Sequence, residues 1–223
     1  GARFDDRITG KLSEFAPRAK FVHIDIDPAE ISKNVPAHIP IVGDAKEVLP
    51  KLTKEYRALQ ADRARLDPWW DQLHRWQRDY PLGYDDSEDS EIKPQAMVEA
   101  MYRATEGDAI ITSDVGQHQM WAAQYYHFTK PRRWINSGGL GTMGFGLPSA
   151  IGAKVANPDE QVVCLAGDGS LIMTCQELAT AVRHQIPVKV FLMNNGYFGM
   201  VRQWQELFWE GRYSAVEMSP SPD

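Results

Sequence analysis

The chain has 223 residues, of which 43% are hydrophobic, and its formal net charge at pH 7 is −6. This hydrophobic content is ordinary for a globular protein, and the length is enough for one or two domains. The acidic balance, without a basic stripe, argues against nucleic acid as a partner. No apolar run approaches the ~20 residues that cross a bilayer, so we expect no membrane association.

Two short strands are predicted near the start of the chain, and each is followed by acidic residues. Residues 21–25 end at Asp25, with Asp27 close behind, and residues 39–42 are followed by Gly43 and Asp44. In doubly wound α/β folds, an acidic side chain at such a strand end bonds a ribose hydroxyl, which favours a nucleotide-binding edge. The alternative is a pair of solvated strand ends, and the G-x-G-x-x-G fingerprint of dinucleotide sites is absent from the sequence.

Residues 45–79 predict helices, and residues 80–91 predict a solvated connection. Trp69, Leu73 and Trp76 recur at helical spacing, and we interpret this aromatic stripe as core packing. The connection combines acidic residues with Pro and Gly, which is typical of an exposed linker. We therefore predict three parts: residues 1–56, a helical and acidic linker at 57–92, and a further domain at 93–223.

The last part opens with a predicted helix at Pro94, a position that tolerates proline, and a strand at residues 109–112. His118 follows on the carboxyl side of that strand, where a histidine is either structural or a ligand contact. A short strand at residues 134–135 then leads into a loop with several glycines, which permit close backbone approach. Met143 lies in that loop, and its ordinary interpretation is a core methionine.

Residues 162–203 predict strand, turn, helix, strand, turn and helix. Two short apolar runs, residues 162–166 and 188–193, indicate buried strands. Between them, Thr174 and Glu177 match a capping box at a helix start. An apolar stripe on this helix is predicted from Cys175, Leu178, Ala179 and Val182. Strands joined by a helix pair in parallel, so we expect the ends of both strands at one edge of a sheet.

Asp168 and Asn195 are expected to lie together at that edge. The first run ends in Gly-Asp-Gly-Ser and the second in Asn-Asn. Glycines let backbone N–H groups approach an anion closely, and Mg²⁺ prefers carboxylate, neutral and phosphate oxygens. The pattern therefore suggests a diphosphate bridged to the protein by Mg²⁺. The alternative is a plain Gly-Asp-Gly turn beside an Asn-capped strand end.

Longer segments extend this pattern to a known family. The Gly-Asp-Gly-Ser segment completed by Asn-Asn resembles the thiamine diphosphate motif of the decarboxylase and carboligase superfamily. Three segments in the same order are similar to the catalytic large subunit of acetolactate (acetohydroxyacid) synthase, and the resemblance covers nearly the whole chain. These segments are residues 1–7, 116–121 and 193–204.

The resemblance implies an α/β fold with a parallel-sheet thiamine diphosphate-binding domain, truncated at its C-terminus and preceded by the end of a Rossmann-like central domain. The chain would then be a fragment. The implied activity is decarboxylation of pyruvate and condensation with a second 2-keto acid, in branched-chain amino acid biosynthesis. The alternatives are another thiamine diphosphate enzyme, such as glyoxylate carboligase or pyruvate oxidase, and a non-catalytic diphosphate-binding module.

The resemblance also assigns residues to three cofactors. The thiamine diphosphate contacts are Gln117, His118, Gly141, Met143, Gly167, Asp168, Gly169, Ser170, Asn195, Tyr197, Gly199 and Met200. Within this set Gly169 and Ser170 donate N–H or hydroxyl hydrogen bonds to the diphosphate, and Met143 holds the cofactor bent. The Mg²⁺ ligands are the side chains of Asp168 and Asn195 and the carbonyl of Tyr197. The FAD contacts are Gly1, Ala2, Arg3, Phe4, Asp5, Asp25, Ile26, Asp44 and Ala45.

Pyruvate and 2-ketobutyrate are the implied substrates. Trp204 is assigned as a wall of the acceptor pocket, with a core aromatic as the alternative, and Asp6 and Arg7 match residues near the mouth of the substrate channel. No catalytic residue is assigned in this chain, because the activating glutamate of the family belongs to an N-terminal domain and comes from the partner subunit. The resemblance therefore implies a homodimer or higher homo-oligomer, with a small regulatory subunit.

The two cysteines bear on the cellular compartment. Cys164 lies in a predicted buried strand and Cys175 on the predicted apolar stripe. Such cysteines in an enzyme-like chain indicate core thiols in a reducing compartment. Together with the resemblance, this favours a cytoplasmic location, or a plastid for a plant protein.

Overall fold

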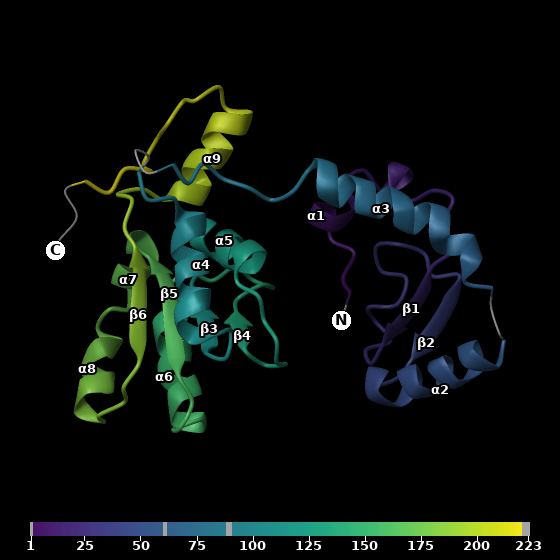
Figure 1. The fold of residues 1–223 in the computed structure, drawn as a ribbon, viewed down its shortest axis with the longest axis horizontal. Helices are drawn as coiled ribbons and strands as arrows, with labels where there is room; N and C mark the ends of the chain where they lie inside the picture. Colours follow the sequence, from purple (N-terminus) through teal and green to yellow (C-terminus); the bar gives the residue numbers. More distant parts are fainter. Residues whose placement is uncertain (1, 60–61, 88–90, 220–223) are drawn as a thin grey trace. The chain divides into compact units, whose positions relative to one another are not determined.

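The chain divides into two compact units, Gly1–Pro81 and Leu82–Asp223 (Figure 1). The computed structural model describes residues 2–59, 62–87 and 91–219, so Gly1 and the linker residues Glu88 and Asp89 lie outside the described residues. The division falls within the predicted linker at residues 57–92. Within the described residues, no helix has both the length and the apolar character that crossing a bilayer requires.

The first unit is built on two parallel strands, β1 (Val22–Asp25) and β2 (Ile39–Val42), in which Asp25 lies opposite Val42. Both strands match the prediction within one residue. The helical segments of this unit are α1 (Asp6–Thr9), η1 (Leu12–Glu14), α2 (Ala45–Ala58), η2 (Ala64–Leu66) and α3 (Asp67–Asp79). Asp44 caps α2, since its carboxylate accepts the N–H of Lys46 at 2.8 Å.

The aromatic stripe of α3 does not form a core in this unit. Every residue of α3 is at least partly exposed, and Trp69 retains 54% of its accessible surface. Its ring packs edge-to-face on Trp76 with centroids 5.7 Å apart. The core interpretation is therefore wrong here, because helical spacing gathers the indoles on one face but supplies no second layer to bury them.

The second unit contains a four-stranded parallel sheet in the order β4-β3-β5-β6. Its strands are β3 (Ile110–Ser113), β4 (Trp134–Asn136), β5 (Val162–Gly167) and β6 (Lys189–Met193). Its helices are α4 (Pro94–Thr105), α5 (Gln117–Tyr125), α6 (Gly146–Ala156), α7 (Asp168–Thr174), α8 (Glu177–Arg183) and α9 (Gly199–Phe208). The predicted α/β fold with parallel strands is confirmed.

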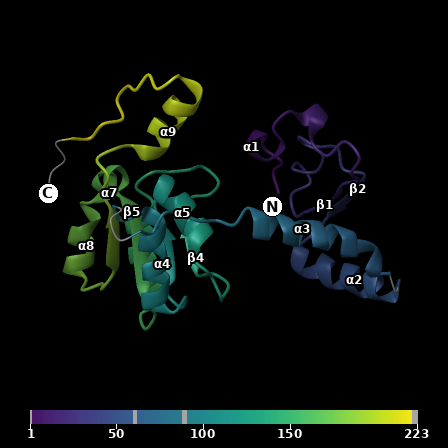
Figure 2. The ribbon, with the colours of Figure 1, turned by 45° about the horizontal axis from the view of Figure 1, so that its top comes forward.

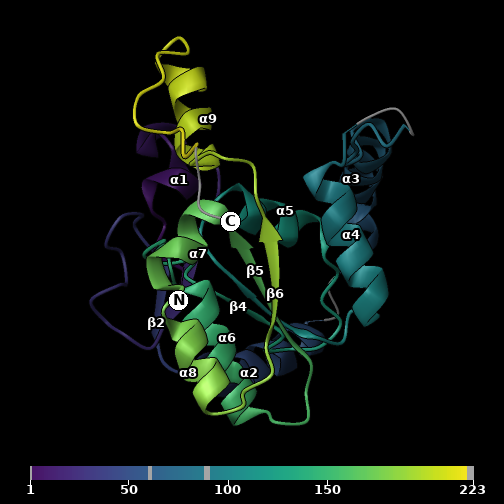
Figure 3. The same cartoon turned by 90° about the vertical axis from the view of Figure 1, so that its left-hand side faces the viewer.

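Helices cover both faces of this sheet (Figures 2 and 3). On one face Ile111 and Leu165 pack with residues of α4 and α5, including Val98, in one buried cluster. On the other face Ile110 and Cys164 pack with residues of α6 and α8 in a second cluster. Because β5 is buried on both sides, its apolar run does not alternate with polar residues. Burial also raises the pKa of the Cys164 thiol to about 12.

The predicted turn and capping box after β5 are both wrong. Asp168 is the first residue of α7, so the Gly-Asp-Gly-Ser segment starts a helix. Thr174 lies at the other end of α7, and its hydroxyl donates to the carbonyl of Gly144 at 3.0 Å. The next helix, α8, begins at Glu177, whose carboxylate accepts from the hydroxyl of Thr180. A tertiary contact thus uses the hydroxyl that the local pattern assigned to a cap.

The predicted stripe of α8 and the predicted burial of β6 are also wrong. Val182 is 78% exposed and Cys175 is exposed, whereas Ala181 faces the core. Strand β6 pairs only with β5 among the described strands, and Met193 is its one buried residue. Edge position explains this pattern, because an edge strand has a neighbour on one side only.

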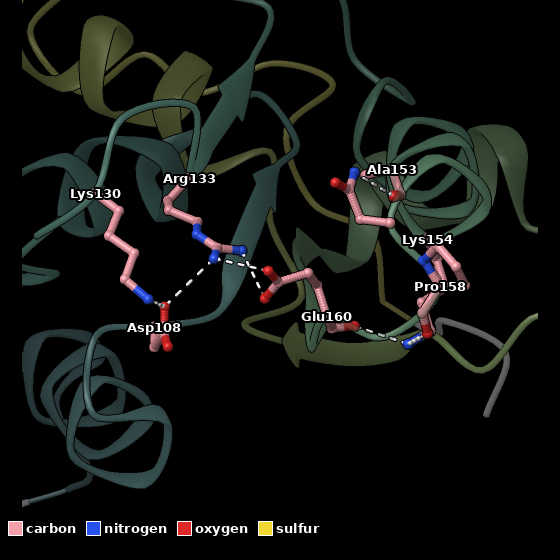
Figure 4. A network of polar contacts seen from close by, with 8 residues as sticks. Asp108, Lys130, Arg133, Ala153, Lys154, Pro158 and Glu160 are labelled. Atoms are coloured by element: carbon pink, nitrogen blue, oxygen red, sulfur yellow. Dashed lines mark hydrogen bonds and ion pairs between the residues drawn. The ribbon is translucent and has the colours of Figure 1, made fainter.

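An ionic network joins three neighbouring strands at their amino ends (Figure 4). Arg133, just before β4, donates a 3.0 Å hydrogen bond to the carboxylate of Glu160, just before β5, and forms an ion pair with it at 2.9 Å. It also lies 3.4 Å from Asp108, which precedes β3 and pairs with Lys130 at 2.6 Å. The Arg133 side chain is only 12% exposed, so water screens these contacts incompletely.

We expect Arg133→Met to lower the melting temperature of the second unit by roughly 2–4 °C at pH 7. Arg133 lowers the pKa of Glu160, and Lys130 lowers that of Asp108. The network therefore stabilises the fold above the ordinary carboxyl pKa values, and this contribution is lost as the pH falls through the lowered ones. Thermal melts at pH 7 and pH 3 test this, with the exposed neighbour variant Arg132→Met as the control. An equal loss at both pH values would contradict the assignment.

Candidate active site

The carboxyl ends of β5 and β6 bring the two predicted magnesium ligands together. Gly167 and Met193 are opposite each other in the parallel register, so Asp168 and Asn195 follow neighbouring strand ends. The Asp168 carboxylate accepts the N–H of Gly196 at 2.7 Å, which joins it directly to the loop that carries Asn195. The predicted meeting of the two strand ends at one edge of the sheet is confirmed.

Asp168 is 6% exposed and its carboxylate is held at both oxygens. One oxygen accepts the N–H of Gly169 at 2.8 Å, and the other accepts the N–H of Gly196. Each oxygen keeps a further lone pair, so the group can still serve a cation. In the described part of the chain, no three His, Cys, Asp or Glu side chains gather as a metal site. Ligation by protein side chains would therefore depend on this one carboxylate and on neutral oxygens.

All of the residues assigned to thiamine diphosphate line one cleft at this edge. The cleft has a volume of about 150 Å³. Sequence reasoning missed further lining residues, namely Val115, Gly116, Trp121, Met193, Phe198 and Val201. Their signal was adjacency, since each lies within a few residues of a predicted contact.

His118 is fitted between two glycines on the wall of the cleft. A Cβ atom at Gly116 would lie 2.7 Å from its ring, and one at Gly167 would lie 2.9 Å from its Nδ1 atom. The ring is 6% exposed, and among the described residues its Nε2 atom has no hydrogen-bond partner. Burial lowers the pKa of His118, which favours the neutral ring. A buried, unpartnered ring nitrogen beside a cleft fits a polar ligand there.

Asp114 holds the glycine-containing loop between β4 and α6 in place. It is fully buried, and one of its oxygens accepts the N–H groups of Val115 and Gly144, each at 2.8 Å. The other oxygen accepts the N–H of Gly146 at 3.2 Å. These bonds fix the backbone on which Met143 is placed in the cleft. Sequence reasoning missed Asp114, because its partners Gly144 and Gly146 lie 30 and 32 residues away in the sequence, and its place directly after a strand was the only local signal.

Two groups assigned as diphosphate donors already have partners within the protein. The hydroxyl of Ser170 donates to the carbonyl of Val115 at 3.1 Å, and the N–H of Gly169 donates to Asp168. Gly169 is also needed for packing, because a Cβ atom there would lie 2.5 Å from the ring of Phe198. The structure thus gives both residues a role in shaping the cleft floor.

Trp204 lies outside the cleft lining. It is on α9, 50% exposed, and its ring lies 5.0 Å from that of Phe208. The core alternative for this residue is therefore wrong. Arg7, the other assigned substrate residue, is exposed on α1 of the first unit, with Asp6 beside it.

Four of the residues assigned to FAD, Asp25, Ile26, Asp44 and Ala45, lie at or just after the carboxyl ends of the two parallel strands. Parallel pairing of β1 and β2 places Asp25 and Asp44 at the same edge. Asp25 is buried, and the N–H of Asp27, which donates to it at 3.0 Å, lowers its pKa. Ile26 is 70% exposed and Ala45 begins α2. The other assigned residues, Ala2 to Asp5, form the segment before α1, and Gly1 lies outside the described residues.

Comparison with known proteins identifies the family. Residues 1–52 match the central domain of thiamine pyrophosphate enzymes, and residues 114–223 match their C-terminal thiamine pyrophosphate-binding domain. The chain belongs to the thiamine pyrophosphate enzymes. The second match contains every residue assigned to thiamine diphosphate in the cleft. Thiamine pyrophosphate and thiamine diphosphate are two names for one compound, so the domain family binds the cofactor that the sequence implied.

The most similar curated relatives include large subunits of acetolactate synthase. The chain is 54% identical to the isozyme 3 large subunit of Escherichia coli K12 over 226 residues, and 52% identical to the large subunit of Haemophilus influenzae over 227 residues. Each comparison covers 100% of this chain and 39% of the relative. The large subunit of Corynebacterium glutamicum is 50% identical over 98% of this chain. The chain is therefore homologous to these subunits along its whole length but spans about two fifths of theirs.

Proposed function

We propose that this chain carries the cofactor-binding half of an acetolactate synthase active site. The full-length protein would decarboxylate pyruvate and join the remaining two-carbon unit to a second 2-keto acid. Pyruvate as acceptor gives 2-acetolactate and 2-ketobutyrate gives 2-aceto-2-hydroxybutyrate, in branched-chain amino acid biosynthesis. The observation that carries the proposal is that residues far apart in the chain, assigned from motifs alone, line one cleft at a parallel sheet edge.

Mg²⁺ fits this edge. The side chains of Asp168 and Asn195 and the carbonyl of Tyr197 would hold it, and all three residues line the cleft. One carboxylate with neutral oxygens leaves room for phosphate oxygens, which Mg²⁺ requires when it bridges a diphosphate. When bound, thiamine diphosphate supplies the electron sink for decarboxylation. The chain's own residues bind it, orient it and exclude water, and Met143 would hold it bent.

The cleft of this chain is incomplete as a cofactor site. Its volume of about 150 Å³ is below the ~300–1,000 Å³ of typical small-molecule sites. We therefore infer that other segments of the full-length protein close it. The resemblance to acetolactate synthase implies that one of these groups is a glutamate from a second copy, which would require at least a homodimer. The relatives are named large subunits, which supports a small regulatory subunit as a further partner.

FAD is the proposed ligand of the first unit. The support is that Asp25 and Asp44 lie at one edge of a parallel strand pair, within the matched central domain. Both carboxylates also make local backbone hydrogen bonds, so they have a structural role with or without a flavin. We also propose that the full-length enzyme is cytoplasmic, or located in a plastid if it comes from a plant.

The function is tested with the full-length enzyme, pyruvate and 2-ketobutyrate. The expected products are 2-acetolactate and 2-aceto-2-hydroxybutyrate, with one CO₂ released for each. Acetyl phosphate or acetate as the product would favour a pyruvate oxidase, and tartronate semialdehyde from glyoxylate would favour a glyoxylate carboligase. Cofactor binding without CO₂ release from pyruvate would leave only a diphosphate-binding module.

We expect Trp204→Leu in the full-length enzyme to lower the preference for 2-ketobutyrate over pyruvate as acceptor, by roughly tenfold. The reason is that an exposed indole on α9 can form a flat apolar wall, and the loss of one methylene contact in such a pocket changes discrimination by about 10–200-fold. Competition between the two acceptors, with product quantification, measures the ratio. Trp76→Leu, an exposed indole on α3 of the first unit, is the control. An unaltered ratio would remove Trp204 from the substrate site.

A further inference from the structure

The chain folds back onto the loop that follows β6. Residues 214–218, here named the return segment, run antiparallel to this loop and form one bridge with it. The N–H of Phe198 donates to the carbonyl of Val216 at 2.8 Å, and the N–H of Met218 donates to the carbonyl of Gly196 at 2.9 Å. Val216 is buried, so the return segment is packed against the rest of the second unit.

The guanidinium group of Arg202, on α9, lies between two aromatic rings and joins α9 to the loop after β6 and to the residue before the return segment. The guanidinium carbon of Arg202 lies 4.1 Å from the ring centroid of Tyr197, on the loop, and 4.9 Å from that of Tyr213, just before the return segment. Both distances are within the ~6 Å range of cation–π attraction. One turn further along α9, the amide of Gln205 makes two 3.0 Å hydrogen bonds to the backbone of Ser214.

The return segment reaches the floor of the cleft. A Cβ atom at Gly169 would lie 2.9 Å from the sulfur of Met218 and 2.5 Å from the ring of Phe198. Both side chains therefore cover the start of α7, directly after Asp168. The loop after β6 is thus held between α7 on one side and the return segment on the other.

We propose that Arg202 is a positioning residue that fastens the return segment to the loop carrying Asn195 and Tyr197. This inference rests on the proposed function, in which the loop after β6 binds Mg²⁺. Fastening sets the Asn195 side chain and the Tyr197 carbonyl in place before any cofactor binds, which lowers the ordering cost of binding. Arg202 lies outside the cleft lining, so it acts through Tyr197 rather than on a ligand.

The test compares Arg202→Met and Arg202→Lys in the full-length protein. Hydrogen exchange without cofactor is followed at the Phe198 and Met218 amides, and calorimetry gives the affinity for Mg²⁺ in the presence of thiamine diphosphate. Arg202→Met is expected to speed exchange at both amides about tenfold and to weaken Mg²⁺ binding about tenfold. Lysine keeps a cation between the rings, so Arg202→Lys should stay within about threefold of the wild type. Arg183→Met, an exposed charge change on α8, should alter neither.

Unchanged exchange at the two amides in Arg202→Met would overturn the proposal. So would faster exchange that extends to the strands β3 and β5, since Arg202 would then be a general stabilising residue. If Arg202→Met does not fold, Tyr213→Leu removes one of the two rings and carries the same measurement. A wild type that binds neither Mg²⁺ nor thiamine diphosphate would defeat the proposed function, while the exchange data would still decide whether Arg202 fastens the segment.

Discussion

Replacing Asp168 with alanine in the full-length protein is expected to weaken Mg²⁺-dependent binding of thiamine diphosphate by at least about a hundredfold. Among the residues that the structure describes, Asp168 is the one carboxylate that lines the cleft where the two strand ends meet, and it would neutralise part of the charge of the proposed Mg²⁺ ion. A factor of a hundred corresponds to about 2.7 kcal/mol, which is a modest requirement for a residue that we propose as the charged protein ligand of a divalent cation.

The Asp168→Ala result needs a second variant, because this carboxylate also accepts the N–H groups of Gly169 and Gly196. Asp168→Asn keeps the shape and one acceptor but removes the charge, so it should lose most of the binding with a smaller loss of stability. Calorimetric titration with Mg²⁺ and thiamine diphosphate measures both variants, and Asp159→Ala, exposed before β5, is the matched control. Unchanged affinity in both Asp168 variants would remove the residue from the cofactor site.

The part of the site that sequence could predict is the part fixed by local rules. The run Val162 to Ala166 is buried on both faces, which made it recognisable as a parallel strand, and a parallel neighbour must end at the same edge. That geometry alone brings Asp168 and Asn195 together. His118 was harder, since only its place after a strand and within a family motif set it apart from a structural histidine.

The wrong predictions share a physical cause, because each was based on a local pattern whose outcome depends on the tertiary arrangement around it. The hydroxyl of Thr174 bonds Gly144, thirty residues away in the sequence, so the capping pattern was never used. The order of the strands in a sheet likewise cannot be predicted from one segment. Strand β6 lies at the sheet edge, and Met193 is its one buried residue, so the prediction of a buried strand was wrong. Asp114 was missed for the same reason, since its partners Gly144 and Gly146 come from another loop.

Asp114→Ala is expected to destabilise the second unit by about 3–5 kcal/mol. The carboxylate is fully buried and accepts three backbone N–H groups, and each buried donor left without a partner costs about 1–3 kcal/mol. Asp114→Asn should also be costly, because donors approach both oxygens and an amide offers only one acceptor. Against a typical stability of about 5–15 kcal/mol, such a loss is a large fraction of the whole.

The segment that loosens in Asp114→Ala distinguishes a role in holding the loop of Gly144 and Gly146 from a general packing role. Loss of Asp114 frees the backbone that carries Met143, so cofactor affinity should fall together with stability even at temperatures where the variant remains folded. Denaturant unfolding gives the stability, native-state hydrogen exchange at the Gly144 and Gly146 amides locates the loosened segment, and Asp159→Ala again serves as the control. Protected amides at these two glycines in a folded Asp114→Ala variant would show that other groups hold the loop, because a buried N–H that keeps its protection has kept a hydrogen-bond partner.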